Sequence, residues 1–91
     1  MSLTVEVHLL SIFRRLAGSE ARRMVALAEG ATVRDLLDHL VEIYGPAFRE
    51  LALSPDATVL VNGGNICLGE GGATRLQPGD RVTLLVSITG G

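Results

Sequence analysis

The chain has 91 residues and a formal net charge of −2, and this length is that of one domain spanning 1–91. Only 3% of the residues are aromatic and the basic residues form no stripe, so nucleic-acid binding is not expected. No apolar run reaches membrane-spanning length, so no membrane partner is expected either. Cys67 is the single cysteine, which excludes a disulfide framework and fits a cytoplasmic location.

Three elements are predicted before residue 30. Residues 3–9 alternate apolar and polar side chains, which predicts a strand with one buried face. Ser11 is placed to cap a short helical turn over 12–17, and Gly18 is placed to close it. Alternation resumes over 22–28, which predicts a second strand.

The clearest helical signal begins at Thr32. Thr32 followed by Asp35 is a variant of the capping box, in which each side chain bonds the backbone N–H of the other residue. Gly45-Pro46 is expected to end this helix. Its apolar stripe at helical spacing consists of Val33, Leu36, Leu37, Leu40, Val41 and Tyr44.

The second half of the chain contains shorter signals, separated by glycine and proline. In chain order they predict a helical turn over 47–53, a strand over 58–62, a tight turn at Asn62-Gly63, a return strand over 66–68, a glycine-rich loop through Gly72, a turn over 76–80 and a final strand over 81–88. A sheet that starts with two strands and is crossed by one main helix is an α+β roll. The first and last strands are the longest and most apolar, so we expect them to form its central pair.

A search for catalytic constellations is mostly negative. His8 and His39 have no carboxylate or cysteine at ligand spacing, so no metal site is predicted. The glycines between residues 63 and 72 lack the Lys-Ser/Thr ending of a phosphate-binding loop and precede no helix. The chain is therefore not expected to be an enzyme on its own or to bind a cofactor.

Residues 89–91, Thr89-Gly90-Gly91, stand out because the last two have no side chain. One interpretation is a frayed end that happens to be glycine. The other is a flexible reactive tail whose Gly91 carboxylate enters a channel too narrow for a Cβ. Leu85 lies nearby on the predicted outer face of the last strand, where an apolar side chain is either incidental or an anchor for a partner protein.

Several segments together resemble a known family. They are the stretch 11–18 after the first strand, Glu29-Gly30-Ala31-Thr32-Val33 before the helix, Val61-Asn62-Gly63, the segment 76–82 and Gly90-Gly91. In this order, over essentially the whole chain, they resemble the ubiquitin-like sulfur carriers of the MoaD/ThiS group. Within the group the chain is most similar to the small subunits of molybdopterin synthases.

This resemblance implies a β-grasp fold and a non-catalytic carrier role. A ubiquitin-activating-type adenylyltransferase would use ATP to adenylate Gly91, and a sulfur donor would convert the adenylate to a thiocarboxylate. Gly90 and Thr89 would then insert with Gly91 into the large catalytic subunit of molybdopterin synthase, in a heterotetramer, to make the dithiolene. Leu85, Ile88 and Phe13 are the candidate partner contacts.

Other readings remain open at this point. The molybdopterin branch often has a proline pair where this chain has Val86-Ser87, whereas the extra length of 45–56 favours that branch. The carrier could instead serve thiamine thiazole, cysteine, tungsten pterin or RNA thiolation pathways, or act as a protein modifier. All eight basic residues are arginine, so no lysine of this chain can accept an acyl group. The last alternative is a β-grasp interaction module with an incidental tail.

Overall fold

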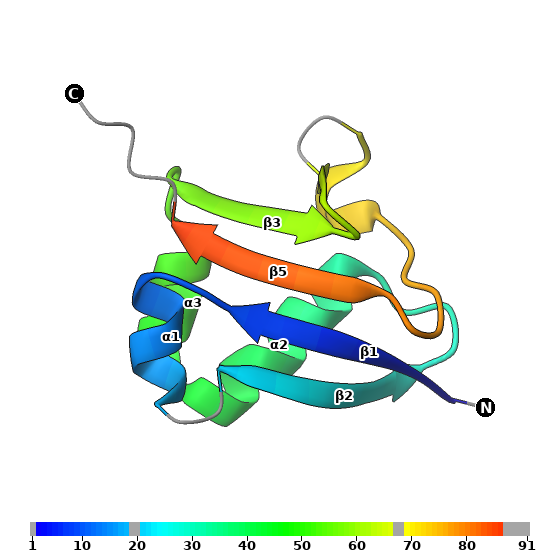
Figure 1. Ribbon diagram of the computed structural model, residues 1–91, viewed down its shortest axis with the longest axis horizontal. Coiled ribbons are helices and arrows are strands. Elements are labelled where there is room, and N and C mark those ends of the chain that lie inside the picture. Colours follow the sequence, from blue (N-terminus) through cyan, green and yellow to red (C-terminus); the bar gives the residue numbers. More distant parts are fainter. Residues whose placement is uncertain (1, 19–20, 67–68, 87–91) are drawn as a thin grey trace.

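The computed structural model describes residues 2–18, 21–66 and 69–86. Figure 1 shows how the helices and strands are arranged. In order they are β1 (Ser2–Leu9), α1 (Ile12–Ala17), β2 (Arg22–Ala28), α2 (Val33–Tyr44), α3 (Pro46–Ala52), β3 (Ala57–Val61), β4 (Gly64–Asn65), the 3-10 helix η2 (Gly71–Ala73) and β5 (Arg81–Val86). The predicted elements are thus confirmed in kind and order with two exceptions, the return strand and the 3-10 helix η2, which forms where a glycine-rich loop was predicted. The last two residues of the predicted strand 81–88 lie outside the described residues.

The five strands form one mixed sheet in the order β2-β1-β5-β3-β4. β1 and β5 are parallel neighbours, with Val7 opposite Val82 and Leu9 opposite Leu84, while the other pairs are antiparallel. The predicted central pairing of first and last strands is therefore confirmed. This mixed sheet, crossed by α2, is the β-grasp fold.

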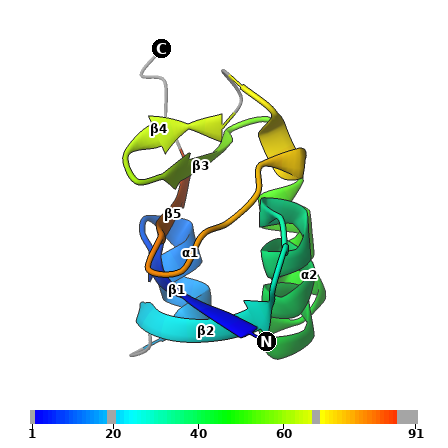
Figure 2. The ribbon, with the colours of Figure 1, turned by 90° about the vertical axis from the view of Figure 1, so that its right-hand side faces the viewer.

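The core lies between the sheet and its helices. Figure 2 shows α2 along one face of the sheet. The inward side chains of β1 and β5 alternate with outward ones, so Val5, Val7 and Leu84 are fully buried. Leu36 and Leu40 of α2 pack into the same core.

Local signals place the ends of α2 as expected. The Asp35 N–H donates to Thr32 Oγ1 at 3.3 Å, and the Thr32 N–H donates to Asp35 Oδ2 at 2.9 Å, which completes the capping box. Gly45 has a φ of 89°, a conformation that favours glycine, and Pro46 then starts α3. At α1 the boundaries are as predicted, but the Ser11 side chain makes no capping hydrogen bond.

The predicted return strand over 66–68 is wrong in position. Asn62 and Gly63 both have positive φ, at 52° and 87°, as in the two-residue turns that let strands resume at once. Pairing therefore restarts at Gly64, opposite Val61, and β4 ends at Asn65. Ile66 packs against the core, and 67–68 lie outside the described residues.

Candidate functional site

β5 leads toward the predicted tail from the middle of the sheet. Leu84 is paired with Leu9 on one side and with Val59 on the other, and pairing to β3 continues to Val86. The strand is therefore fixed by neighbours up to Val86, where its described part ends. Two sets of predicted site residues lie outside the described residues. They are the tail, Thr89-Gly90-Gly91, and the contact candidate Ile88.

Leu85 faces away from the core, as predicted. It alternates with the buried Leu84 and is itself half-buried on the outer face of the sheet. Leu60 of β3 is opposite Thr83 and therefore diagonal to Leu85 on the same face. On the other side, the Leu10 N–H donates to the Leu84 carbonyl at 2.9 Å, and 44% of Leu10 is exposed. We call Leu10, Leu60 and Leu85 the sheet-face cluster.

Sequence reasoning found only one of these three leucines. Thr58 to Val61 is apolar at three consecutive positions, so alternation alone does not say which side of β3 faces the core. Leu10 follows the predicted strand and carries no signal of its own. The register with β5 places Leu60 diagonal to Leu85, and Leu10 directly follows Leu9, which lies opposite Leu84.

Phe13 is a correction to the predicted partner contacts. Its side chain has no exposed surface, and its ring centroid lies 5.3 Å from that of Phe48 in a tilted arrangement. Phe48 stacks in turn on Tyr44, with centroids 5.5 Å apart. Phe13 therefore belongs to the core, and Ile12 and Leu16 are the exposed apolar residues of α1.

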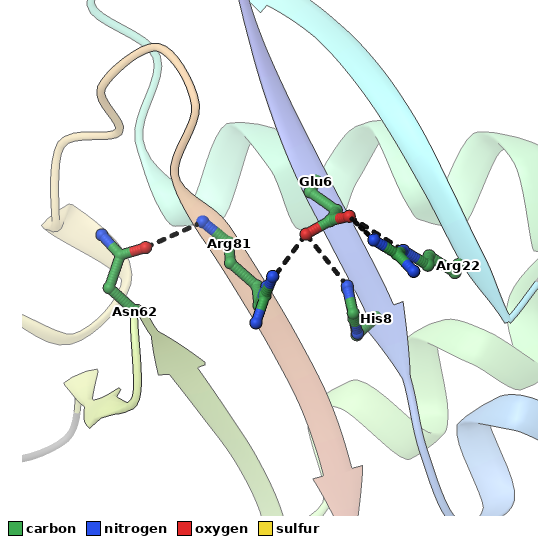
Figure 3. A network of polar contacts seen from close by, with 5 residues as sticks. All are labelled: Glu6, His8, Arg22, Asn62 and Arg81. Carbon is green, nitrogen blue, oxygen red and sulfur yellow. Dashed lines mark hydrogen bonds and ion pairs between the residues drawn. The ribbon is translucent and has the colours of Figure 1, made fainter.

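A polar network occupies the centre of the outer face (Figure 3). Arg22 Nε donates to Glu6 Oε1 at 2.8 Å, and Arg81 Nε donates to Oε2 at 2.9 Å. His8 Nε2 lies 3.1 Å from Oε2, but its direction does not meet hydrogen-bond geometry. Asn62 holds the start of β5 by accepting the Arg81 backbone N–H at 2.9 Å. The carboxylate of Glu6 thus ties together β2, β1 and β5.

These contacts lower the pKa of Glu6 from 4.5 to about 2. The main cause is the hydrogen bond from Arg22, followed by that from Arg81, and both favour the ionised carboxylate. The Glu6 side chain is 17% exposed, whereas those of Arg22 and Arg81 are 68% and 58% exposed. Solvent and salt therefore screen the network.

We expect the Glu6 network to make folding stability depend on pH in the acid range. Because the folded pKa lies below the unfolded value, its contribution is complete above about pH 4.5 and is lost as pH falls toward about 2. Glu6→Gln should therefore flatten the loss of unfolding free energy across this window, as measured by urea denaturation at several pH values. An unchanged pH slope in the variant would contradict the assignment. The difference should shrink in high salt.

Neither histidine is part of a metal site among the described residues. Among residues 2–18, 21–66 and 69–86, no group of three His, Cys, Asp or Glu side chains could hold a metal ion. His8 lies beside the Glu6 carboxylate in the polar network, and His39 lies half-buried on α2. No helix in the described part of the chain is long and apolar enough to cross a bilayer.

A β-grasp sheet whose central strand leads to the tail is the architecture of ubiquitin-like carriers, and comparison with known proteins agrees. The ThiS family model matches residues 7–91. The chain therefore belongs to the ThiS family of ubiquitin-like sulfur carriers. Among curated proteins, none matches it in sequence.

Three solved structures show the range of similar proteins. The small archaeal modifier protein 1 (SAMP1) from Methanosarcina acetivorans is 27% identical, with a TM-score of 0.83 over 100% of this chain and 99% of its own. A Pyrococcus furiosus protein assigned as molybdopterin converting factor, subunit 1, is 27% identical, with a TM-score of 0.80 over 94% and 99%. A chain of the BexX/CysO complex from Amycolatopsis orientalis is 26% identical, with a TM-score of 0.76 over 96% and 99%.

Proposed function

We propose that this chain is the sulfur-carrying small subunit of a molybdopterin synthase and has no catalytic activity alone. The observation that carries the proposal is the family match, which includes the tail through residue 91. Similarity to a molybdopterin converting factor subunit over 94% of the chain supports the choice of pathway. The partners would be an activating enzyme, a sulfur donor and the large subunit.

The proposed cycle has two steps at Gly91. Its carboxylate oxygen attacks the α-phosphate of ATP on the activating enzyme, so pyrophosphate leaves and an acyl-adenylate forms. Sulfide supplied by the sulfur donor then attacks the acyl carbon, AMP leaves with the electrons of the broken acyl–oxygen bond, and Gly91 is left as a thiocarboxylate. Without a Cβ on either terminal glycine, the acyl carbon is open to attack. ATP is thus a substrate of the activating enzyme and not a cofactor of this chain.

A second candidate is a ThiS-family carrier or modifier of a different pathway. It is favoured by the similarity to SAMP1, which is named as a modifier protein, and to a chain of the BexX/CysO complex. As a modifier, this chain would be joined through Gly91 to lysines of other proteins. It would not form chains on its own side chains, because it contains no lysine.

Intact mass measurement on untagged protein from its native host tests both candidates. A carrier is expected to show one oxygen of the Gly91 carboxylate replaced by sulfur, and deletion of the large-subunit gene should increase that fraction in the molybdopterin pathway. A modifier would instead leave a Gly-Gly remnant on lysines of other proteins after digestion. With the activating enzyme expressed, finding neither product would contradict both candidates.

We expect Leu85→Asp to weaken binding of the large subunit by about tenfold or more, in the range of buried apolar anchors at interfaces. The reason is that Leu85 lies at the centre of the sheet-face cluster, where a carboxylate would be desolvated on binding. Met24→Asp is the matched control, because Met24 is 60% exposed on the same face but lies on the edge strand β2. Calorimetric titration measures both. Equal affinities, or unfolding of Leu85→Asp, would contradict this role.

A further inference from the structure

A groove between α1 and α3 lies outside the sheet-face cluster. It has a volume of about 350 Å³ and is lined mostly by apolar atoms. Its wall on α1 consists of Ile12 and Leu16, which are 46% and 37% exposed. These two residues are four apart, so they lie on the same side of the helix. The opposite wall consists of Ala47, Glu50 and Leu51 of α3 and of Ser54, which follows α3.

The core does not need these two side chains. In the six residues of α1, Phe13 alone is fully buried, and it fills the space next to Phe48. Ile12 and Leu16 are therefore partly exposed apolar side chains, side by side on the wall of a hollow that has room for a further side chain. Such a pairing of exposed apolar residues with a recess is typical of an interaction surface.

Positive charge lies next to the groove, on α1. Arg14 and Arg15 are exposed, and neither forms a described ion pair among residues 2–18, 21–66 and 69–86. With Ser11, Ile12 and Gly18 they line a second, open hollow that shares Ile12 with the groove. Among the residues that the structure describes, Glu50 is the one acidic residue that lines either hollow. An acidic segment is therefore the complementary partner for this side of the molecule.

The groove lies at the end of the sheet where β5 stops. Figure 1 shows α1 and α3 beside the end toward which β5 points, and the Leu10 N–H bonds the Leu84 carbonyl at 2.9 Å. Leu10 of the sheet-face cluster and Ile12 of the groove are separated by one residue. A protein that binds the sheet-face cluster and takes residues 87–91 therefore has the groove within reach.

The geometry points to the α1–α3 groove as a docking site for an acidic segment of the activating enzyme that carries one aliphatic or aromatic side chain. That side chain enters the groove and packs against Ile12 and Leu16, and neighbouring carboxylates pair with Arg14 and Arg15. This inference rests on the proposed function. The activating enzyme is chosen because adenylation of Gly91 is common to all the carrier pathways considered above.

The test uses the full chain and the purified activating enzyme of the same host. Pyrophosphate exchange into ATP is measured while the concentration of the carrier is varied. Ile12→Glu and Leu16→Glu are expected to raise the apparent KM for the carrier about tenfold, a size typical of truncated interface anchors, and to leave kcat unchanged at saturation. Leu53→Glu is the matched control, because Leu53 is 74% exposed at the end of α3 but does not line this groove.

The positive charge next to the groove is tested separately. The double variant Arg14→Glu/Arg15→Glu should raise KM and reduce its dependence on salt concentration, since exposed charge pairs are screened. Arg75→Glu, on an exposed arginine that lines a different hollow, should change neither. Circular dichroism confirms folding of each variant, and Ile12→Ala and Leu16→Ala replace any variant that fails to fold.

The outcomes separate this inference from the proposed function. If the wild-type chain supports no exchange at all, the proposed adenylation of Gly91 is wrong. If the wild type is active and the groove variants match Leu53→Glu, the docking site is wrong while the carrier role stands. A change confined to kcat would also overturn the inference, because docking on a remote surface acts on binding.

Discussion

Gly90→Val should reduce formation of the Gly91 thiocarboxylate by about a hundredfold or more, the cost of misplacing a reacting group by about an ångström. A β-branched side chain one residue before the reacting carbon widens the tail and restricts its backbone, whereas glycine does neither. The fold should not change, because the described part of β5 ends four residues earlier and the described core residues lie between Leu3 and Leu84. Intact mass spectrometry after incubation with ATP, sulfur donor and activating enzyme measures the product.

Gly69→Val is the control for this change. Gly69 is an exposed loop glycine, and a Cβ built there meets only the Ile66 carbonyl oxygen at 3.9 Å, an ordinary contact. This variant should be charged with sulfur at the wild-type rate. If Gly90→Val is also charged at that rate, the tail does not thread a narrow site, and the interaction-module reading gains support.

The fold was predictable because its signals are local and agree with one another. The alternation in β1, the Thr32 capping box and the Gly45-Pro46 break each fix one element, and the order of elements leaves few topologies. The position of the return strand was predicted wrongly because pairing restarts directly after the Asn62-Gly63 turn. The paired residues, Gly64 and Asn65, have little strand propensity and gave no signal.

The outer face was less predictable because its contacts join distant parts of the chain. Glu6 bonds Arg22, sixteen residues away, and Arg81, seventy-five residues away, so their meeting depends on the register of three strands. The same holds for Leu60 and Leu10, whose positions relative to Leu85 depend on the pairing of β3 and β1 with β5. Leu85 itself was found because β5 alternates clearly.

The prediction that Phe13 contacts a partner was wrong for a different reason. Ile12, Phe13 and Leu16 are all apolar, and a helix of six residues is too short for periodicity to show which side is buried. The structure turns Phe13 inward against Phe48 and leaves Ile12 and Leu16 outside. The aromatic side chain that suggested a partner contact is thus a core residue, and its aliphatic neighbours form the exposed surface.

This placement predicts a large effect on stability. Phe13→Ala should lower the free energy of unfolding by about 3–5 kcal/mol, the usual cost of deleting a buried aromatic ring. For a domain of this size that is a large part of a total of about 5–15 kcal/mol. Ile12→Ala, on the exposed neighbour, should change it by no more than about 0.5 kcal/mol. Urea denaturation at neutral pH measures both, with the slope m expected to stay constant.

The aromatic pair sharpens this test. If Phe13 acts by packing on Phe48, the double variant Phe13→Ala/Phe48→Ala should lose less than the sum of the single losses, because each single change already removes the contact. Strict additivity would mean that the two rings do not interact. A loss below about 1 kcal/mol for Phe13→Ala would mean that the ring is not in the core, and would return Phe13 to the candidate partner contacts. Comparing the unfolding free energies of the Phe13 and Ile12 variants therefore distinguishes the core residue of α1 from its exposed neighbour.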